Sequence, residues 1–212
     1  MARVRIHNFS ISLDGFGAGE PQSLETPFGH AGQRLHSWMV ATRFWDPVDG
    51  SAGVDDALAE QHSSGIGAEV MGANKFGPPG WQDDPNWRGW WGEEPPFHTP
   101  VLVLTHRPRS PLEMEGGTTF HFLDAPLEDA VGVATDAADG LDVRIGGGAT
   151  VVRDAFAADL VDHAHLVQVP IVLGRGSRVW DGLEDLDRRY AVETVASPSG
   201  VVHLTFTRRP DA

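Results

Sequence analysis

The chain has 212 residues, of which 41% are hydrophobic, so it is long enough to bury the core of one domain spanning residues 1–212. Its 30 acidic and 16 basic residues give a net charge of -14, which opposes binding to nucleic acid and to anionic membrane surfaces. There is no apolar run of membrane-spanning length, no signal-peptide pattern and no cysteine, so we expect a cytoplasmic protein without disulfides or thiolate chemistry.

The first half of the chain predicts strands and helices separated by long loops. Arg3 to Leu13 alternates apolar and polar residues like a half-buried strand and ends at the turn Asp14-Gly15. Phe16 to Gly32 is rich in glycine and has no period, which indicates a mobile loop. Hydrophobic spacing then predicts helices over Gln33 to Trp45 and Val54 to His62, and strands over Gly67 to Gly72 and Pro100 to Thr105. The last of these is apolar almost throughout, so we expect it to be central in the sheet.

The second half alternates strands and helices before it changes character. We expect strands over Thr118 to Leu123 and Leu141 to Ile145, and helices over Leu127 to Ala138 and Ala149 to Ala158. Three strands follow without long helices: Ala164 to Leu173, Arg188 to Val195 and Val201 to Arg209, the last two joined by a turn at Ser197 to Gly200. This order predicts a three-layer α/β fold with a mixed, mostly parallel sheet flanked by helices and a C-terminal antiparallel hairpin.

Gly146-Gly147-Gly148 lies between a predicted strand and a predicted helix. Backbone amides at such a turn can approach phosphate oxygens, and the helix dipole adds positive charge there. The spacing matches neither the Rossmann fingerprint nor the P-loop, so a turn that only packs a helix on a strand is the alternative.

Polar residues follow two other predicted strands. Lys75, the only lysine, comes just after Met71-Gly72, where it could neutralise a pyrophosphate or be an ordinary solvated side chain. Thr105-His106-Arg107 follows the predicted central strand. Ligands of open α/β sheets bind at the carboxyl ends of strands, so these segments and the glycine turn predict one binding site.

These segments, together with Ser12-Leu13-Asp14-Gly15, Leu160-Val161-Asp162 and the run from Pro170 to Gly176, resemble the dihydrofolate reductase superfamily. The similarity covers nearly the whole chain. It is most specific to the reductase domain of the bacterial riboflavin-biosynthesis deaminase-reductase and its single-domain relatives. The resemblance implies a homodimeric oxidoreductase that uses NADPH, with NADH as the alternative cofactor, to reduce a pterin-like, pyrimidine or flavin-like substrate.

The resemblance also implies roles for individual residues. Asp14 would contact the substrate or steer its proton, and Gly17 and Ala18 would lie near the nicotinamide. Thr105, His106 and Arg107 would lie near the adenosine ribose and its 2′-phosphate. The remaining residues implied to bind the cofactor would line the pyrophosphate: Gly72, Ala73, Asn74, Lys75, Gly146, Gly147, Gly148, Ala149 and Thr150.

The chain departs from the family pattern at two places. The family often has arginine after the Met-Gly pair and threonine two places later, where this chain has Ala73 and Lys75; Arg107 could compensate. Relatives commonly carry Asp-Glu where this chain has Asp162-His163, so a carboxylate directed at the substrate is missing. A protein that binds a nucleotide or heterocycle without turnover is therefore the alternative to a reductase, and a purely structural protein is the third hypothesis.

Tryptophans and histidines raise further alternatives. Four of the seven tryptophans, Trp90 and Trp91 among them, lie in a Pro/Gly-rich loop, which is either a lid over a planar substrate or a loop packed on the protein's own surface or on a partner subunit. His163 and His165 would share one face of a strand, but no third ligand is placed by the sequence, so we expect no metal site.

Overall fold

The computed structural model describes residues 2–210, and its first half contains these elements: β1 (Val4–Ser12), β2 (Phe16–Ala18), η1 (Gly29–Leu35), α1 (Ser37–Val40), α2 (Val54–Ser63), β3 (Ile66–Gly72), α3 (Ala73–Phe76), η2 (Trp81–Asp83) and β4 (Pro100–Leu104). The second half contains β5 (Leu112–Glu113), η3 (Glu115–Gly117), β6 (Thr119–Leu123), α4 (Leu127–Ala137), β7 (Asp142–Gly147), α5 (Ala149–Ala157), β8 (His163–Val169), β9 (Ser177–Arg178), α6 (Leu186–Arg189), β10 (Tyr190–Ala196) and β11 (Val202–Arg208). No helix within residues 2–210 has the length and apolar character needed to cross a membrane.

A nine-stranded sheet runs through the molecule in the order β10-β11-β8-β1-β7-β3-β4-β6-β5. The strands from β8 to β6 pair in parallel, while β10, β11 and β5 pair antiparallel with their neighbours. The mixed, mostly parallel sheet and the C-terminal hairpin are therefore confirmed. β2 and β9 form a separate small antiparallel sheet.

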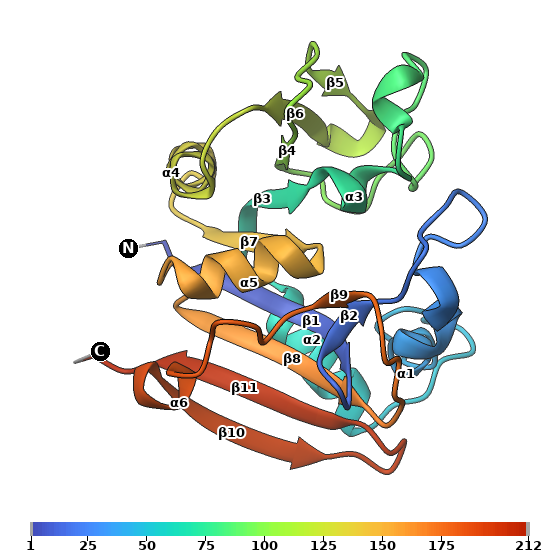
Figure 1. Cartoon of the computed structure of the whole chain (residues 1–212), viewed down its shortest axis with the longest axis vertical. Coiled ribbons are helices and arrows are strands. Elements are labelled where there is room, and N and C mark those ends of the chain that lie inside the picture. Colours follow the sequence, from blue (N-terminus) through green and yellow to red (C-terminus); the bar gives the residue numbers. More distant parts are fainter. Residues whose placement is uncertain (1, 211–212) are drawn as a thin grey trace.

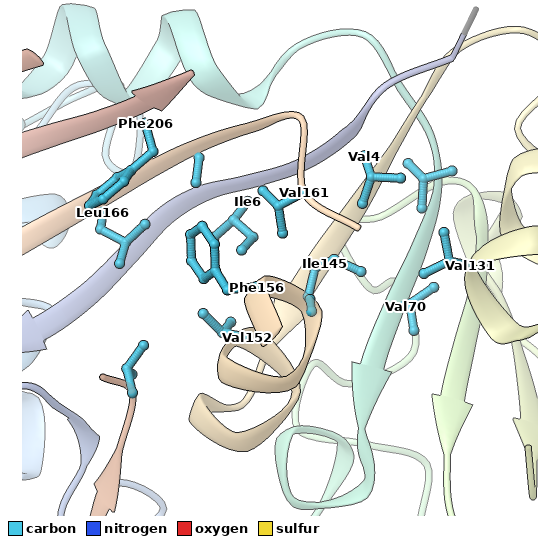
Figure 2. Close-up of a cluster of buried hydrophobic side chains, with 14 of the residues drawn as sticks. Val4, Ile6, Val70, Val131, Ile145, Val152, Phe156, Val161, Leu166 and Phe206 are labelled. Atoms are coloured by element: carbon cyan, nitrogen blue, oxygen red, sulfur yellow. The ribbon is translucent and has the colours of Figure 1, made fainter. Parts of the chain in front are cut away.

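Helices cover both faces of the sheet, as the three-layer prediction required. On one face α4 packs on β3 and β4, and α5 packs on β7 (Figure 1). Their apolar sides bury a cluster in which Val131, Val152 and Phe156 meet strand residues such as Ile6 and Ile145 (Figure 2). On the other face α2 packs on β1, and α1 packs on α2.

A further apolar cluster covers β4 and β6 on the face opposite α4. Phe76 at the end of α3 is fully buried there and packs edge-on against Trp81, Phe120 and Phe122. The indole N–H of Trp81 donates to the carbonyl of Ala73, which satisfies the one polar group of this buried ring. The tryptophan-rich loop therefore forms part of the protein's own core.

One prediction about local structure was wrong. The helix predicted over Gln33 to Trp45 is not continuous: η1 ends at Leu35 and the four-residue α1 ends at Val40, beyond which Ser51 takes backbone hydrogen bonds with Ala41 and Arg43. The strand predicted to be central, β4, is an interior strand between β3 and β6, and β7 stands at the middle of the order. The sequence predictions also missed β2, β5 and β9.

Candidate functional site

One large cavity of about 1200 Å³ opens where the parallel strands β7, β3 and β4 end. These strands are neighbours, so the segments that follow their carboxyl ends meet at one edge of the sheet. The loop after β1, the segment around α1 and part of the tryptophan-rich loop complete the wall.

The cavity collects nearly all the residues that the sequence predicted for a binding site. The predicted residues in its wall are Gly17, Ala18, Gly72, Ala73, Asn74, Lys75, Trp90, Trp91, Thr105, His106, Arg107, Gly146, Gly147, Gly148, Ala149 and Thr150. Asp14 alone among the predicted residues is not in the wall.

Gly146 and Gly148, at the junction of β7 and α5, have different surroundings. A Cβ on Gly146 would lie 1.8 Å from Glu69 Oε1, so this glycine is required by a buried carboxylate of the protein itself. A Cβ on Gly148 would meet no protein atom within 4 Å. Gly148 therefore leaves free space at the start of α5, whose first backbone N–H groups have no partners inside the helix.

A cluster of charged side chains forms one side of the cavity. Glu69 on β3 is 1% exposed and lies between Lys75 and Arg144, with Lys75 Nζ 2.9 Å from Oε1 and Arg144 bonded to Oε2. Burial alone would raise the pKa of Glu69, but Arg144 and Lys75 outweigh burial and lower it. Burial lowers the pKa of Lys75, and Glu69 opposes that effect. With Lys75 protonated, two cations against one carboxylate leave one net positive charge at the cavity wall. The sequence predictions named Lys75 but missed Glu69 and Arg144, although a charged residue inside an apolar strand is a signal that a partner is needed.

Two histidines of the cavity wall have ring nitrogens that no described residue satisfies. His7 Nδ1 and His36 Nδ1 are both buried atoms without a hydrogen-bond partner in residues 2–210. Burial lowers the pKa of His36 to about 4, with a smaller contribution from Lys75. Burial, Arg144 and Arg5 lower the pKa of His7 well below its usual range. Both rings are therefore neutral at physiological pH and available for hydrogen bonding.

The segment after β4 supplies exposed polar side chains. His106 is almost fully exposed and lies 2.9 Å from Asp124, while Arg107 Nη1 lies 2.7 Å from Asp83 in a pair that is more than half exposed on both sides. Exposed pairs of this kind contribute only about 0–1 kcal/mol, so Arg107 can leave Asp83 for an anionic ligand at little cost.

Asp14 is held inside the turn that follows β1. Its carboxylate accepts hydrogen bonds from the Ser12 hydroxyl at 2.6 Å and from the backbone N–H groups of Leu173 and Gly174 at 3.1 and 2.7 Å. Burial would raise the pKa of Asp14, but these hydrogen bonds outweigh it and lower the pKa to about 2. The geometry gives Asp14 an anchoring role, and its contact with a substrate stays a prediction.

Trp90 and Trp91 combine the two alternatives that the sequence left open. Trp90 packs edge-on against Trp87 with ring centroids 5.1 Å apart, and Trp91 packs in the same way against Phe97 at 4.8 Å. Both also line the cavity. The loop is thus packed on the protein's own surface, and a stacking role toward a ligand stays a prediction.

Four other histidines, His62, His163, His165 and His203, form a largely buried network outside the cavity wall. His163 and His165 both stack on His62, which confirms that they share one face of β8. His165 Nε2 lies 2.9 Å from His203 Nδ1, and His203 Nε2 lies 2.8 Å from Asp55. No group of three or more metal-ligating side chains is arranged around a common point in residues 2–210.

Comparisons with known proteins agree with this architecture. The family model of the RibD C-terminal domain matches residues 4–203. A putative riboflavin biosynthesis protein from Shewanella sp. PV-4 aligns with a TM-score of 0.58 at 20% identity, covering 98% of this chain and 99% of that one. A pyrimidine reductase-like protein from Corynebacterium diphtheriae aligns with a TM-score of 0.55 at 16% identity, covering 99% and 93%.

A bifunctional protein from Thermotoga maritima, a diaminohydroxyphosphoribosylaminopyrimidine deaminase/5-amino-6-(5-phosphoribosylamino)uracil reductase, also aligns, with a TM-score of 0.55 at 15% identity. The alignment covers 98% of this chain but 57% of that protein. No curated protein sequence matches the chain. Because the family model spans nearly the whole sequence, the chain belongs to the RibD C-terminal domain family.

Proposed function

We propose that the protein is an NADPH-dependent reductase of a small heterocyclic substrate, similar to 5-amino-6-(5-phosphoribosylamino)uracil reductase. The observation that carries the proposal is the convergence of the ends of β7, β3 and β4 on one cavity, with a net positive charge at its wall in a chain of net charge -14. A negatively charged dinucleotide needs such local cations and free backbone N–H groups, because the overall charge of the chain repels it.

The cavity residues fit the parts of a nicotinamide dinucleotide. Gly148 leaves open space beside the first N–H groups of α5, where phosphate oxygens would bind, and Lys75 and Arg144 lie on the same wall. His106 and Arg107 would contact the adenosine end, and Gly17 and Ala18 the nicotinamide end. NADPH supplies a hydride when bound, so the protein needs no nucleophile of its own and contributes orientation and exclusion of water.

A titration of the purified protein with NADPH and with NADH, followed by tryptophan fluorescence, tests the proposal. We expect Arg107→Ala and Lys75→Ala each to raise the Kd for NADPH about tenfold, which corresponds to ~1.4 kcal/mol, because a hydrogen bond to a charged group is worth about that much. Arg107→Ala should affect NADH much less, since NADH lacks the 2′-phosphate.

Arg153→Ala is the matched control for these variants. Arg153 is a cation on α5 that pairs with Asp154 at 3.0 Å and does not line the cavity, so its loss should leave the Kd unchanged. Thermal unfolding of each variant shows whether the fold is intact. If folded wild-type protein binds neither cofactor, the reductase proposal fails.

A second candidate is a protein that binds a nucleotide or heterocycle without turning it over. Asp14, the residue with the implied catalytic role, is anchored outside the cavity wall, and this observation favours the candidate. NADPH binding without NADPH oxidation across pterin-like, pyrimidine and flavin-like acceptors would support it over the reductase.

A further inference from the structure

β1 contains an irregularity beside the cavity. The register between β1 and β8 shifts between Ile6 and Phe9, and Asn8 has a φ of 54°, in the left-handed region. As a result His7, Asn8, Phe9 and Ser10 all line the cavity, although a regular strand would present only alternate residues to one side. Bulges of this kind re-aim side chains next to functional sites.

Hydrogen-bond donors around His7 fix which of its nitrogens carries the proton. Arg144 Nη1 lies 2.6 Å from His7 Nε2, and because a guanidinium can only donate, Nε2 must accept. The hydrogen of the neutral ring is therefore on Nδ1. That N–H has no acceptor in residues 2–210, although His7 is only 8% exposed.

A buried donor without a partner costs free energy unless a ligand or a water supplies an acceptor. A second proton on the ring would not relieve this, because the imidazolium would be buried beside Arg144, Arg5 and Lys75. The site thus holds a neutral donor whose natural partner is an uncharged acceptor. Anionic phosphate oxygens are better matched by the ammonium and guanidinium groups of Lys75 and Arg144.

We propose that the Nδ1–H of His7 donates a hydrogen bond to a carbonyl oxygen of the substrate ring, so that His7 is a specificity-determining residue. The proposal rests on the proposed function in placing the heterocycle in this cavity. Apolar side chains from β1 and the segment around α1, among them Phe9, Phe28 and Met39, share the wall and suit the faces of a planar ring.

The first test needs no ligand. Nitrogen-15 NMR of the imidazole rings should show His7 as a neutral ring with hydrogen on Nδ1 near neutral pH. A neutral ring protonated at Nε2, or an imidazolium, would overturn the proposal. The imidazole signal that is missing from the spectrum of His7→Gln is assigned to His7. A second spectrum, recorded with saturating NADPH, shows whether the bound cofactor changes the protonation of this ring.

The second test uses lumazine, which carries two ring carbonyls, and pteridine, which carries none. The amide of His7→Asn places an N–H donor near the position of Nδ1, whereas the amide of His7→Gln reaches the position of Nε2. We expect the Kd for lumazine to rise about tenfold in His7→Gln and only a few-fold in His7→Asn, while pteridine binding stays unchanged in both. His121→Asn, which changes a histidine of β6 outside the cavity wall, is the matched control.

The outcomes separate the two proposals. Equal losses for lumazine and pteridine, equal losses in both variants, or no saturable lumazine binding by wild-type protein would overturn the role of His7. Lumazine binding with the expected pattern in a protein that does not bind NADPH would instead uphold His7 and overturn the reductase proposal.

Discussion

Asp14 joins two loops that are far apart in the sequence. Its carboxylate bridges the turn after β1 to the backbone of Leu173 and Gly174, four and five residues beyond the end of β8. β2, which carries Gly17 and Ala18, starts just after this turn. We therefore expect Asp14 to act on the cavity as a positioning residue, through the position of β2.

The hydrogen bonds to Asp14 predict a pH dependence of stability. Its pKa is about 2 in the folded chain and 3.8 in the reference state, so the carboxylate stabilises the fold above about pH 4 and loses this effect as the pH falls toward 2. Because the side chain is partly exposed, we expect a contribution on the order of 1 kcal/mol. Thermal unfolding of Asp14→Asn across this range should show a Tm gap to wild type that closes at low pH. A gap that stays constant would contradict the assignment.

Glu69 and Arg144 show that a charged residue within a strand indicates a charged partner but does not identify that partner. Glu69 is the one charged residue of β3, and Arg144 lies between the buried Val143 and Ile145 of β7, so each requires a charged partner at its depth. The sequence names the two charges, but their pairing depends on β3 and β7 being neighbours, with Glu69 opposite Arg144 in the register. That neighbour relation joins segments more than 70 residues apart, so local patterns could not supply it.

At the scale of elements, the glycine turn before α5 has one part packed against the protein and one part that faces open space. Gly146 makes room for Glu69, and Gly148 faces open space. We expect Gly148→Ala to raise the Kd for NADPH at least about tenfold, because a methyl group would occupy the space that a phosphate needs. The backbone of Gly148 has a φ of -75°, which alanine adopts readily.

Gly132→Ala on α4 is the control for this substitution. It also adds a methyl group into open space, but α4 does not line the cavity. It should leave NADPH binding unchanged and stabilise the helix by about 0.5–1 kcal/mol. If Gly148→Ala, with a wild-type Tm, bound NADPH as tightly as Gly132→Ala does, the turn would not be the phosphate site.

Periodicity predicted the long elements well and failed where short segments share backbone hydrogen bonds with distant loops. α2, α4 and α5 were confirmed because each has a clear helical spacing and buries one face. The prediction of a regular alternation missed the irregularity in β1, although its apolar positions change phase between Ile6 and Phe9. The end of α1 at Val40 could not be read from local patterns, since the residues that follow it bond to Ser51, eight and ten positions later.

At the scale of the whole molecule, the cavity is assembled from segments between residues 7 and 177. The sequence predicted which strand ends would meet, because the carboxyl edge of a parallel sheet is a general place for ligands. It did not predict His7 or His36, since their place in the wall depends on the irregularity in β1 and on the path of the segment before α1. The set of polar groups in the cavity wall is thus a property of the assembled fold.

The opposition between the overall charge and the local charge predicts how salt affects cofactor binding. On the proposed function, the net charge of -14 would repel NADPH at long range, while Lys75 and Arg144 would attract it at the wall. Raising the ionic strength from about 0.01 to 0.15 M shortens the screening length from about 30 to 8 Å, which weakens the long-range repulsion more than contacts at partly buried cations. The association rate of NADPH, measured by stopped-flow tryptophan quenching, should therefore rise with salt, while the dissociation rate should change little. An association rate that falls with salt would mean that the cations of the cavity dominate the field at a distance, and that the acidic surface does not oppose the approach of the cofactor.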